Sequence, residues 1–131
     1  MSLSPARRNA LFAALAFVSI LFAMGGLEGW MEQRDARRQL VYVIPPGTSA
    51  RLQAGEKIDV LPATIRLALD AQDTLVIRND DSEPVTVGVF RLEAGQQLQQ
   101  KFTQPGTYKL ICSAHSSGEL QIVVERTASK P

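Results

Sequence analysis

An apolar segment from Ala10 to Gly26 constrains this chain more than any other part of its sequence. Ser19 is the one polar residue in it, and Leu27, Trp30 and Met31 prolong it. A helix needs about 20 apolar residues, at about 1.5 Å each, to cross the hydrocarbon layer of a bilayer. The sequence therefore predicts one membrane helix near the N-terminus.

The chain of 131 residues divides by composition into consecutive parts. Residues 1–31 form an N-terminal tail and the membrane helix, and residues 10–31 contact membrane lipid. Residues 32–39 are charged and free of glycine and proline, which predicts a solvated helical stalk. Residues 40–126 form one domain with a modest core. Residues 127–131 have nothing to bury and are expected to be disordered.

A cleaved signal peptide is the alternative for the N-terminal segment. Arg7 and Arg8 supply a basic start, and residues 23–25 loosely resemble a small-x-small cleavage pattern. The apolar run is longer than the roughly 7 to 15 residues of a signal-peptide core, which favours a retained anchor.

Basic residues on both sides of the anchor leave its orientation nearly balanced. Arg7 and Arg8 precede the segment, whereas Arg34, Arg37 and Arg38 follow it, and positive charge favours the cytoplasmic side. A domain that follows a signal-like helix is translocated more naturally than a very short N-terminal tail. We therefore expect a single-pass protein of the cell membrane whose C-terminal domain is extracytoplasmic.

From Leu40 onward, short segments show period-two alternation, β-branched residues and turn signals, which predicts an all-β, antiparallel sandwich. We expect strands at residues 40–44, 65–69, 74–78, 85–89, 96–102, 107–112 and 119–125. Prolines and glycines mark several of the turns between them. No long helix is expected in this part of the chain.

Charge and cysteine content exclude several classes of protein. The formal net charge is +1, from 14 basic and 13 acidic residues, so no basic surface for nucleic acid is indicated. One cysteine and one histidine exclude an internal disulfide framework and a four-ligand zinc site. Any metal chemistry must therefore use few ligands.

Two motifs carry a resemblance to a known family. Residues 105–115 read PGTYKLICSAH, and Asn79 is followed five positions later by Pro84. Both motifs resemble those of the plastocyanin-like cupredoxins, in which Gly-Thr-Tyr precedes a cysteine and then a loop with histidine, and an Asn-containing loop ends in Pro-His. The resemblance extends from Thr74 to Glu125 and implies a cupredoxin-like sandwich after the N-terminal transmembrane helix.

The resemblance also implies a metal site. Cupredoxins hold copper with two histidines and a cysteine thiolate, usually with a weak axial methionine. Cys112 and His115 stand where the family has its thiolate and second histidine. Val85 occupies the position of the first histidine, and Gly118 or Leu120 occupies that of the axial methionine.

The copper-ligand set is therefore incomplete. His115 is the only histidine, and Met1, Met24 and Met31 lie in or before the membrane segment. Copper remains possible as a cofactor only with few ligands or with a ligand from a partner. Otherwise Cys112 is an inert core thiol and His115 a loop imidazole bonded to backbone.

Two function hypotheses follow. In the first, the domain binds copper or transfers electrons at Cys112 and His115. In the second, it is a copper-free interaction module, an accessory subunit of a membrane electron-transfer complex. We do not expect an enzyme, because no residue that would orient a Cys–His pair is identifiable. Asp80, Asp81 and Glu83 are interpreted as turn residues and not as a site for a hard cation.

Overall fold

The computed structural model describes residues 4–127, with the side chain of residue 27 left out. Residues 1–3 of the predicted tail and residues 128–131 of the predicted disordered segment lie outside the described residues. The chain divides into two compact units between Ala36 and Arg37, and each is described separately. The first holds all of helix α1 except its last residue, and the second holds the strands.

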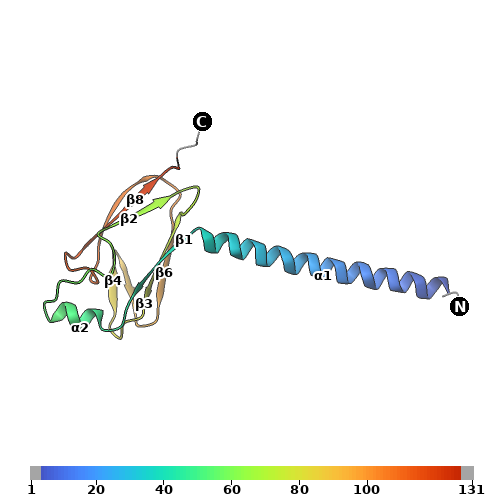
Figure 1. Cartoon of the computed structure of the whole chain (residues 1–131), viewed down its shortest axis with the longest axis horizontal. Coiled ribbons are helices and arrows are strands. Elements are labelled where there is room, and N and C mark those ends of the chain that lie inside the picture. The colour runs from blue at the N-terminus through green and yellow to red at the C-terminus, as the bar shows by residue number, and fades with distance from the viewer. Residues whose placement is uncertain (1–3, 128–131) are drawn as a thin grey trace. The chain divides into compact units, whose positions relative to one another are not determined.

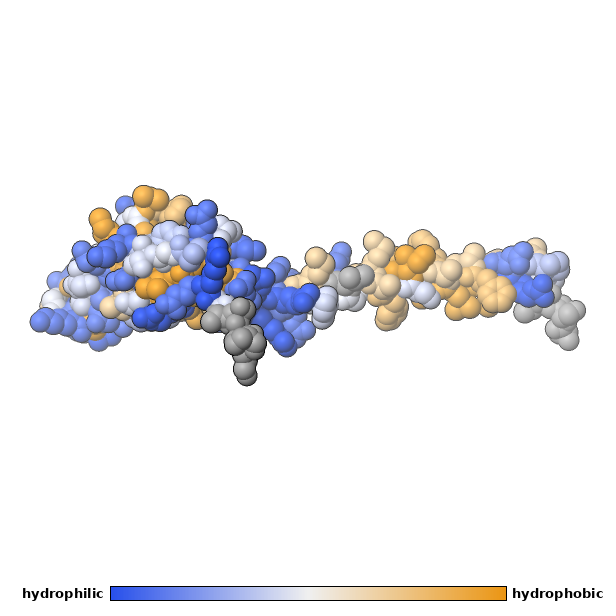
Figure 2. Space-filling model, turned by 90° about the horizontal axis from the view of Figure 1, so that it is seen from above, coloured by the Kyte–Doolittle hydropathy of each residue, from blue (hydrophilic) through white to orange (hydrophobic). Residues whose placement is uncertain are grey.

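Helix α1 spans Pro5–Arg37 and is long and apolar enough to cross a membrane. Its 33 residues correspond to about 50 Å, which exceeds the hydrocarbon thickness. Ser19 donates its hydroxyl to the Leu15 carbonyl at 2.8 Å, so its polar group is satisfied within the helix. Figure 2 shows the apolar stretch of α1 with hydrophilic surface at each end.

The C-terminal part of α1 carries the charged residues of the predicted stalk. The Arg34 guanidinium lies 4.3 Å from the centroid of the Trp30 ring, a cation–π contact. Tryptophan is enriched where a helix leaves the hydrocarbon layer. The helix continues through Arg37, and Gln39 is already the first residue of a strand.

The second unit is a β-sandwich (Figure 1). One sheet has the strand order β1-β3-β6, and the other has the order β2-β8-β7. A hairpin of β4 and β5 adjoins the end of β7. The elements are β1 (Gln39–Ile44), α2 (Thr48–Gln53), β2 (Thr64–Ala68), β3 (Thr74–Asn79), β4 (Val85–Val87), β5 (Phe90–Leu92), β6 (Gln97–Lys101), β7 (Gly106–Ile111) and β8 (Glu119–Glu125).

The sheets are mixed, which refines the prediction of an antiparallel sandwich. Strand β1 is parallel to β3 and β2 is parallel to β8, whereas the pairs β3–β6, β7–β8 and β4–β5 are antiparallel. Parallel neighbours require a crossover connection. The chain supplies one by passing through the opposite sheet, as β2 does between β1 and β3.

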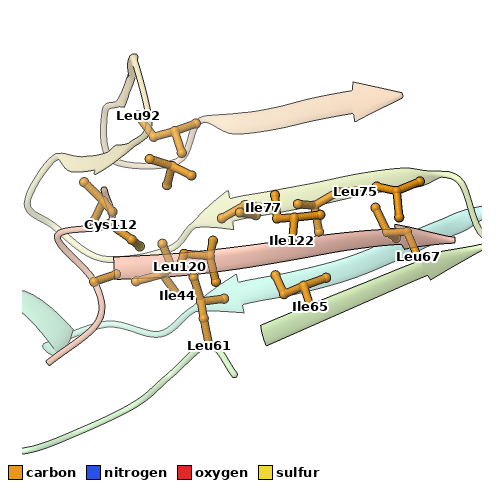
Figure 3. Close-up of a cluster of buried hydrophobic side chains, with 14 residues drawn as sticks. Ile44, Leu61, Ile65, Leu67, Leu75, Ile77, Leu92, Cys112, Leu120 and Ile122 are labelled. Carbon is orange, nitrogen blue, oxygen red and sulfur yellow. The ribbon is translucent and has the colours of Figure 1, made fainter. Parts of the chain in front are cut away.

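The core lies between the two sheets and comes from the alternation seen in the sequence. Ile65 and Leu67 of β2 are buried, and so are alternate residues of β8. Figure 3 shows these side chains facing those of β3. The largest fully buried apolar side chains are Ile44, Leu61, Ile65, Leu75, Ile77, Leu120, Ile122, Val85 and Val87.

The prediction of one strand over residues 85–89 is wrong at its end. Val85 and Val87 are buried in β4, but Val89 is 92% exposed. The chain reverses at Gly88, whose φ of +61° lies in the left-handed region that favours glycine. The alternation of buried valines therefore ends at this turn, which the spacing of the valines in the sequence did not indicate.

The acidic loop after β3 is a structural loop, as the sequence interpretation held. The Asp81 carboxylate accepts backbone N–H bonds from Gly47 at 2.9 Å, Ser49 at 2.7 Å and Ser82 at 2.8 Å. Burial by itself would raise the pKa of Asp81, but the bonds from Ser49, Gly47 and Ser82 outweigh it and lower the pKa to about 2. Asp81 thus joins this loop to the start of α2, a short helix the sequence did not predict.

Candidate metal centre

Cys112 directly follows β7 and lies in the core. Its side chain is 0% exposed, and its backbone forms an isolated bridge with Val87 of β4. Its N–H donates to the Gly118 carbonyl at 2.9 Å, which closes the loop that follows. Figure 3 shows Cys112 at one end of the cluster of buried hydrophobic side chains.

The surroundings of Cys112 keep its sulfur protonated. Burial raises the pKa of the Cys112 thiol, although backbone N–H groups of Ala114 and His115 oppose the rise. The thiolate, and not the thiol, is the nucleophile and the metal ligand. Cys112 is therefore an unreactive thiol in the absence of a metal that displaces its proton.

The His115 ring is buried in the loop between β7 and β8. One of its nitrogens, Nδ1, accepts a hydrogen bond from the Ser117 backbone N–H at 3.2 Å, and the Ser117 hydroxyl lies 2.7 Å from the same atom. A backbone N–H can only donate, so Nδ1 acts as the acceptor and the ring proton of the neutral form sits on Nε2. The lone pair on Nδ1 is thus already used within the loop.

The other nitrogen of His115 faces a carboxylate from a distant part of the sequence. Nε2 lies 3.5 Å from Asp59 Oδ1, and it is a buried nitrogen without a hydrogen-bond partner among the described residues. The contact is close enough for an ion pair but too long for a good hydrogen bond. Asp59 and His115 also form an isolated backbone bridge, which joins the loop before β2 to the loop after β7.

The Asp59 carboxylate has a nearer partner in Ser116. The Ser116 hydroxyl donates to Asp59 Oδ1 at 2.6 Å. This bond lowers the pKa of Asp59, burial opposes the change, and the proximity of His115 adds to the lowering. Asp59 therefore stays ionised beside the His115 ring.

The position expected for the first histidine belongs to the hydrophobic core. Val85 is 1% exposed and pairs with Leu92 across the β4–β5 hairpin. Leu120 is 1% exposed in the same core cluster, and Gly118 is a turn residue with a φ of +72°. None of these three residues has a side-chain atom that can ligate a metal.

Asn79, the first residue of the motif that runs from Asn79 to Pro84, has a structural role. Its buried amide donates to the Glu83 carbonyl at 2.9 Å and to the Leu92 carbonyl at 3.1 Å. Its side-chain oxygen accepts the Asp81 N–H at 3.0 Å. These bonds fix the loop that leads into Val85, where a cupredoxin would place a ligand.

The residues do not form a complete copper centre. The structure brings Cys112 and His115 into one loop, but Val85, Gly118 and Leu120 supply no ligand. Across residues 4–127, no group of three or more His, Cys, Asp or Glu side chains could hold a metal ion. Ligation of a metal by Cys112 and His115 alone stays a prediction.

Sequence reasoning missed Asp59 and Ser117 as neighbours of His115. Ser117 follows the histidine by two positions, and hydroxyl residues at that spacing often bond locally, so a signal for it was present. Asp59 lies in an irregular segment before β2, and no pattern in the sequence connects it to His115.

Comparison with known proteins adds information about the fold alone. No family model matches the sequence, and no curated protein matches it. Among solved structures, a purple cupredoxin from Nitrosopumilus maritimus is 22% identical, with 65% of this chain and 98% of that chain covered and a TM-score of 0.45. A copper(I) form of an amicyanin mutant is 19% identical, with 66% and 82% covered and a TM-score of 0.46.

A further match is one chain from the cryo-electron microscopy structure of a heme-copper terminal oxidase dimer. It is 12% identical, covers 92% of this chain and 99% of that chain, and has a TM-score of 0.38. The strand-bearing unit has a cupredoxin-like fold, which confirms the fold prediction from the sequence. An apolar helix precedes it, as predicted.

Proposed function

We propose that this protein is a membrane-tethered, copper-free interaction module that works as an accessory subunit of a membrane protein complex. One observation carries the proposal: the place of the first copper-binding histidine is taken by Val85, a core residue that is 1% exposed. A copper centre at this position would need a polar ligand in the middle of a hydrophobic cluster.

The state of His115 supports the same conclusion. Nδ1 is bonded by the Ser117 N–H, and a metal on this nitrogen would have to displace that bond. The sulfur of Cys112 is buried and protonated. A sandwich without a working metal site leaves its surface as the part of the domain that can bind a partner.

Helix α1 supports the choice of a membrane complex. A retained anchor holds the domain near other membrane proteins, which raises its effective concentration for them and allows weak contacts to suffice. The proposal places the domain on the extracytoplasmic side. Protease that reaches the outer face of the intact cell membrane should digest the domain, whereas protection of the domain until that membrane is permeabilised would place it in the cytoplasm.

The proposal assigns no catalytic reaction to the protein. Asp59, His115 and Cys112 include the residue types of a nucleophilic triad, with Asp59 Oδ1 3.5 Å from Nε2 of His115. A nucleophile must reach its substrate, however, and Cys112 is 0% exposed behind Val85 and Val87 of the core.

Copper titration of the full-length protein in detergent tests the proposal. Cu(I) and Cu(II) are added under reducing and oxidising conditions, and bound metal and thiolate-to-copper absorption are measured. We expect no stoichiometric binding, and the same result for Cys112→Ser. Native sizing should show the chain migrating with other subunits. Stoichiometric copper that disappears in Cys112→Ser would overturn the copper-free proposal, and a lone monomer would overturn the accessory role.

A second candidate function is Cu(I) binding or electron transfer by Cys112 and His115. The observation in its favour is that a thiol and an imidazole, both of which suit copper, stand in one loop and that the N–H groups of Ala114 and His115 favour the thiolate. Ser117→Ala separates the candidates, because it removes the hydroxyl contact to Nδ1 and leaves only the backbone N–H bond, which should tighten Cu(I) binding if His115 is a ligand. An interaction module would be indifferent to this change in the titration.

A further inference from the structure

An open groove lies between the edge strands β6 and β7, and Leu75 of β3 and Ile122 of β8 are among the residues that line it. It has a volume of about 570 Å³, which lies in the range of ligand-binding pockets. Strand β6 ends the order β1-β3-β6, and β7 ends the order β2-β8-β7. The groove therefore opens where the two sheets are not closed by a further strand.

Side chains that a closed sandwich would bury are only partly covered in this groove. Leu98 of β6 and Leu110 of β7 are half-buried, and Tyr108 is 37% exposed. At the rim, Val89 is 92% exposed and Ile111 is 70% exposed. Exposed apolar side chains gathered in one groove mark a binding surface rather than a solvated face.

The backbone at the groove is also available for pairing. Among the described residues, β6 pairs with β3 alone and β7 has β8 as its one full-length partner. The β4–β5 hairpin contacts the end of β7, where Gly88 donates to the Ile111 carbonyl at 2.7 Å, and β5 also contacts β6 without pairing with it. The remaining outer edges present N–H and C=O groups in the arrangement that accepts an added strand.

The charged side chains along the groove indicate the charge of the molecule that would bind there. Among residues 4–127, Lys101 and Lys109 are the charged residues that line the groove, and no acidic residue of this range lines it. Asp73, whose carboxyl is influenced by Lys101, is 3% exposed and is already bonded by Arg38 and Thr74. An occupant that carries a carboxylate would therefore complement both lysines.

We propose that the groove between β6 and β7 binds an extended polypeptide segment of a partner membrane subunit, with apolar side chains at alternate positions and at least one carboxylate. The inference rests on the proposed accessory role and names its contact surface. Free strand edges favour a polypeptide over a lipid, because a lipid chain cannot use backbone hydrogen bonds. The alternation follows from period-two side-chain directions along a strand.

Site-specific photo-crosslinking in the native membrane tests this proposal. The full chain carries p-benzoylphenylalanine in place of Val89 or Ile111 at the groove or, as a control, in place of Val41, which is 52% exposed on β1. Crosslinked peptides are then mapped by mass spectrometry. We expect Val89 and Ile111 positions to link to one short segment of one membrane subunit, and the Val41 position to give no such link.

Charge reversal provides the second arm of the test. Lys101→Glu combined with Lys109→Glu should lower the groove crosslink about tenfold by placing like charges opposite each other. Lys57→Glu, at a lysine that is also exposed but lies outside the groove, should leave the crosslink unchanged. Native sizing of each variant is run in parallel.

Each outcome decides between the two proposals. Links to lipid, to a second copy of this chain, or to a segment without a carboxylate would overturn the groove proposal, as would a crosslink that survives the double reversal. If the groove gives no crosslink but the chain still migrates with other subunits, the groove assignment fails and the accessory role stands. If the chain migrates alone, the accessory role itself fails.

Discussion

Strands β3 and β7 have similar lengths and similar apolar content, but the protein uses them in opposite ways. Five of the six residues of β3 are buried, whereas none of the six residues of β7 is fully buried. Strand β3 has neighbours on both sides, β1 and β6, and β7 lies at the edge of its sheet. Neighbours on both sides, and not the hydrophobicity of a strand, therefore decide how much of it leaves water.

This difference also indicates different roles for the two strands, stability of the fold for β3 and binding for β7. The covered strand β3 ends at Asn79, and the hydrogen bonds of Asn79 and of nearby Asp81 fix the adjacent loop. The exposed strand β7 contributes Tyr108 and Leu110 to the groove. We expect substitutions in the first region to alter folding and substitutions in the second to alter association.

The largest expected effect comes from truncating a buried side chain of β3. Ile77→Ala should lower the free energy of unfolding by about 2 to 5 kcal/mol, because Ile77 is 0% exposed and leaves a cavity. Ile111→Ala in β7 should change it by no more than about 0.5 kcal/mol, because Ile111 is 70% exposed. Denaturant unfolding of the two variants, followed by circular dichroism, measures the difference. Equal losses would remove the distinction between the strands.

The next effect is the pH dependence of folding stability that comes from Asp81 in the loop after β3. The folded pKa of Asp81, about 2, lies below its ordinary value of 3.8, so its ionised form stabilises the fold at every pH above that ordinary value. The stabilisation, about 2 kcal/mol, should disappear as pH falls from about 4 to about 2. Asp81→Asn should lower stability at neutral pH and flatten this acid dependence.

Asp80→Asn is the matched control for the acid dependence. Asp80 is more exposed than Asp81, and its carboxylate pairs with Arg78 at the surface. Surface pairs of this kind contribute little to stability. If the control flattened the acid limb of the stability curve as much as Asp81→Asn does, the buried hydrogen bonds would not be its source.

The smallest of these effects concerns the turn at the rim of the groove. Gly88→Ala should cost about 1 to 2 kcal/mol from its left-handed φ of +61°, with an added cost because a Cβ would lie 3.3 Å from Leu110 Cδ2. Gly95→Ala, with a φ of +80° and open space around it, isolates the backbone strain. Thermal unfolding of both variants gives the difference, and identical losses would mean that Leu110 moves aside freely.

Much of the fold could be predicted from the sequence, because local patterns encode it. The last predicted strand, residues 119–125, coincides with β8, and residues 40–44 lie within β1. The motif that ends in Cys112 and His115 placed both residues in one loop. Val89 was assigned to the wrong element, because a glycine turn interrupts an alternation that a local pattern would continue.

The candidate site was predicted less completely, because its neighbours come from separate segments. The contact of Asp59 with His115 joins residues far apart in the sequence. The hydrogen bonds that join Asp81 to the start of α2 also connect separate segments. Their donors, the N–H groups of Gly47 and Ser49, precede β2, whereas Asp81 follows β3. Periodicity reports which face of a strand is apolar, but it does not report which segment comes to lie against that face.

The sequence by itself determined an apolar helix of membrane-spanning length, a β-rich unit with a cupredoxin-like motif, and the lack of a complete copper-ligand set. These properties depend on residue type and short-range spacing. Only the tertiary structure decided that Val85 packs in the core, that Nδ1 of His115 is bonded by Ser117, and that β6 and β7 leave a groove open. Those outcomes depend on which strands become neighbours. Strand pairing in turn depends on how much apolar surface all the strands of the sandwich bury together, and a local sequence pattern does not contain this information.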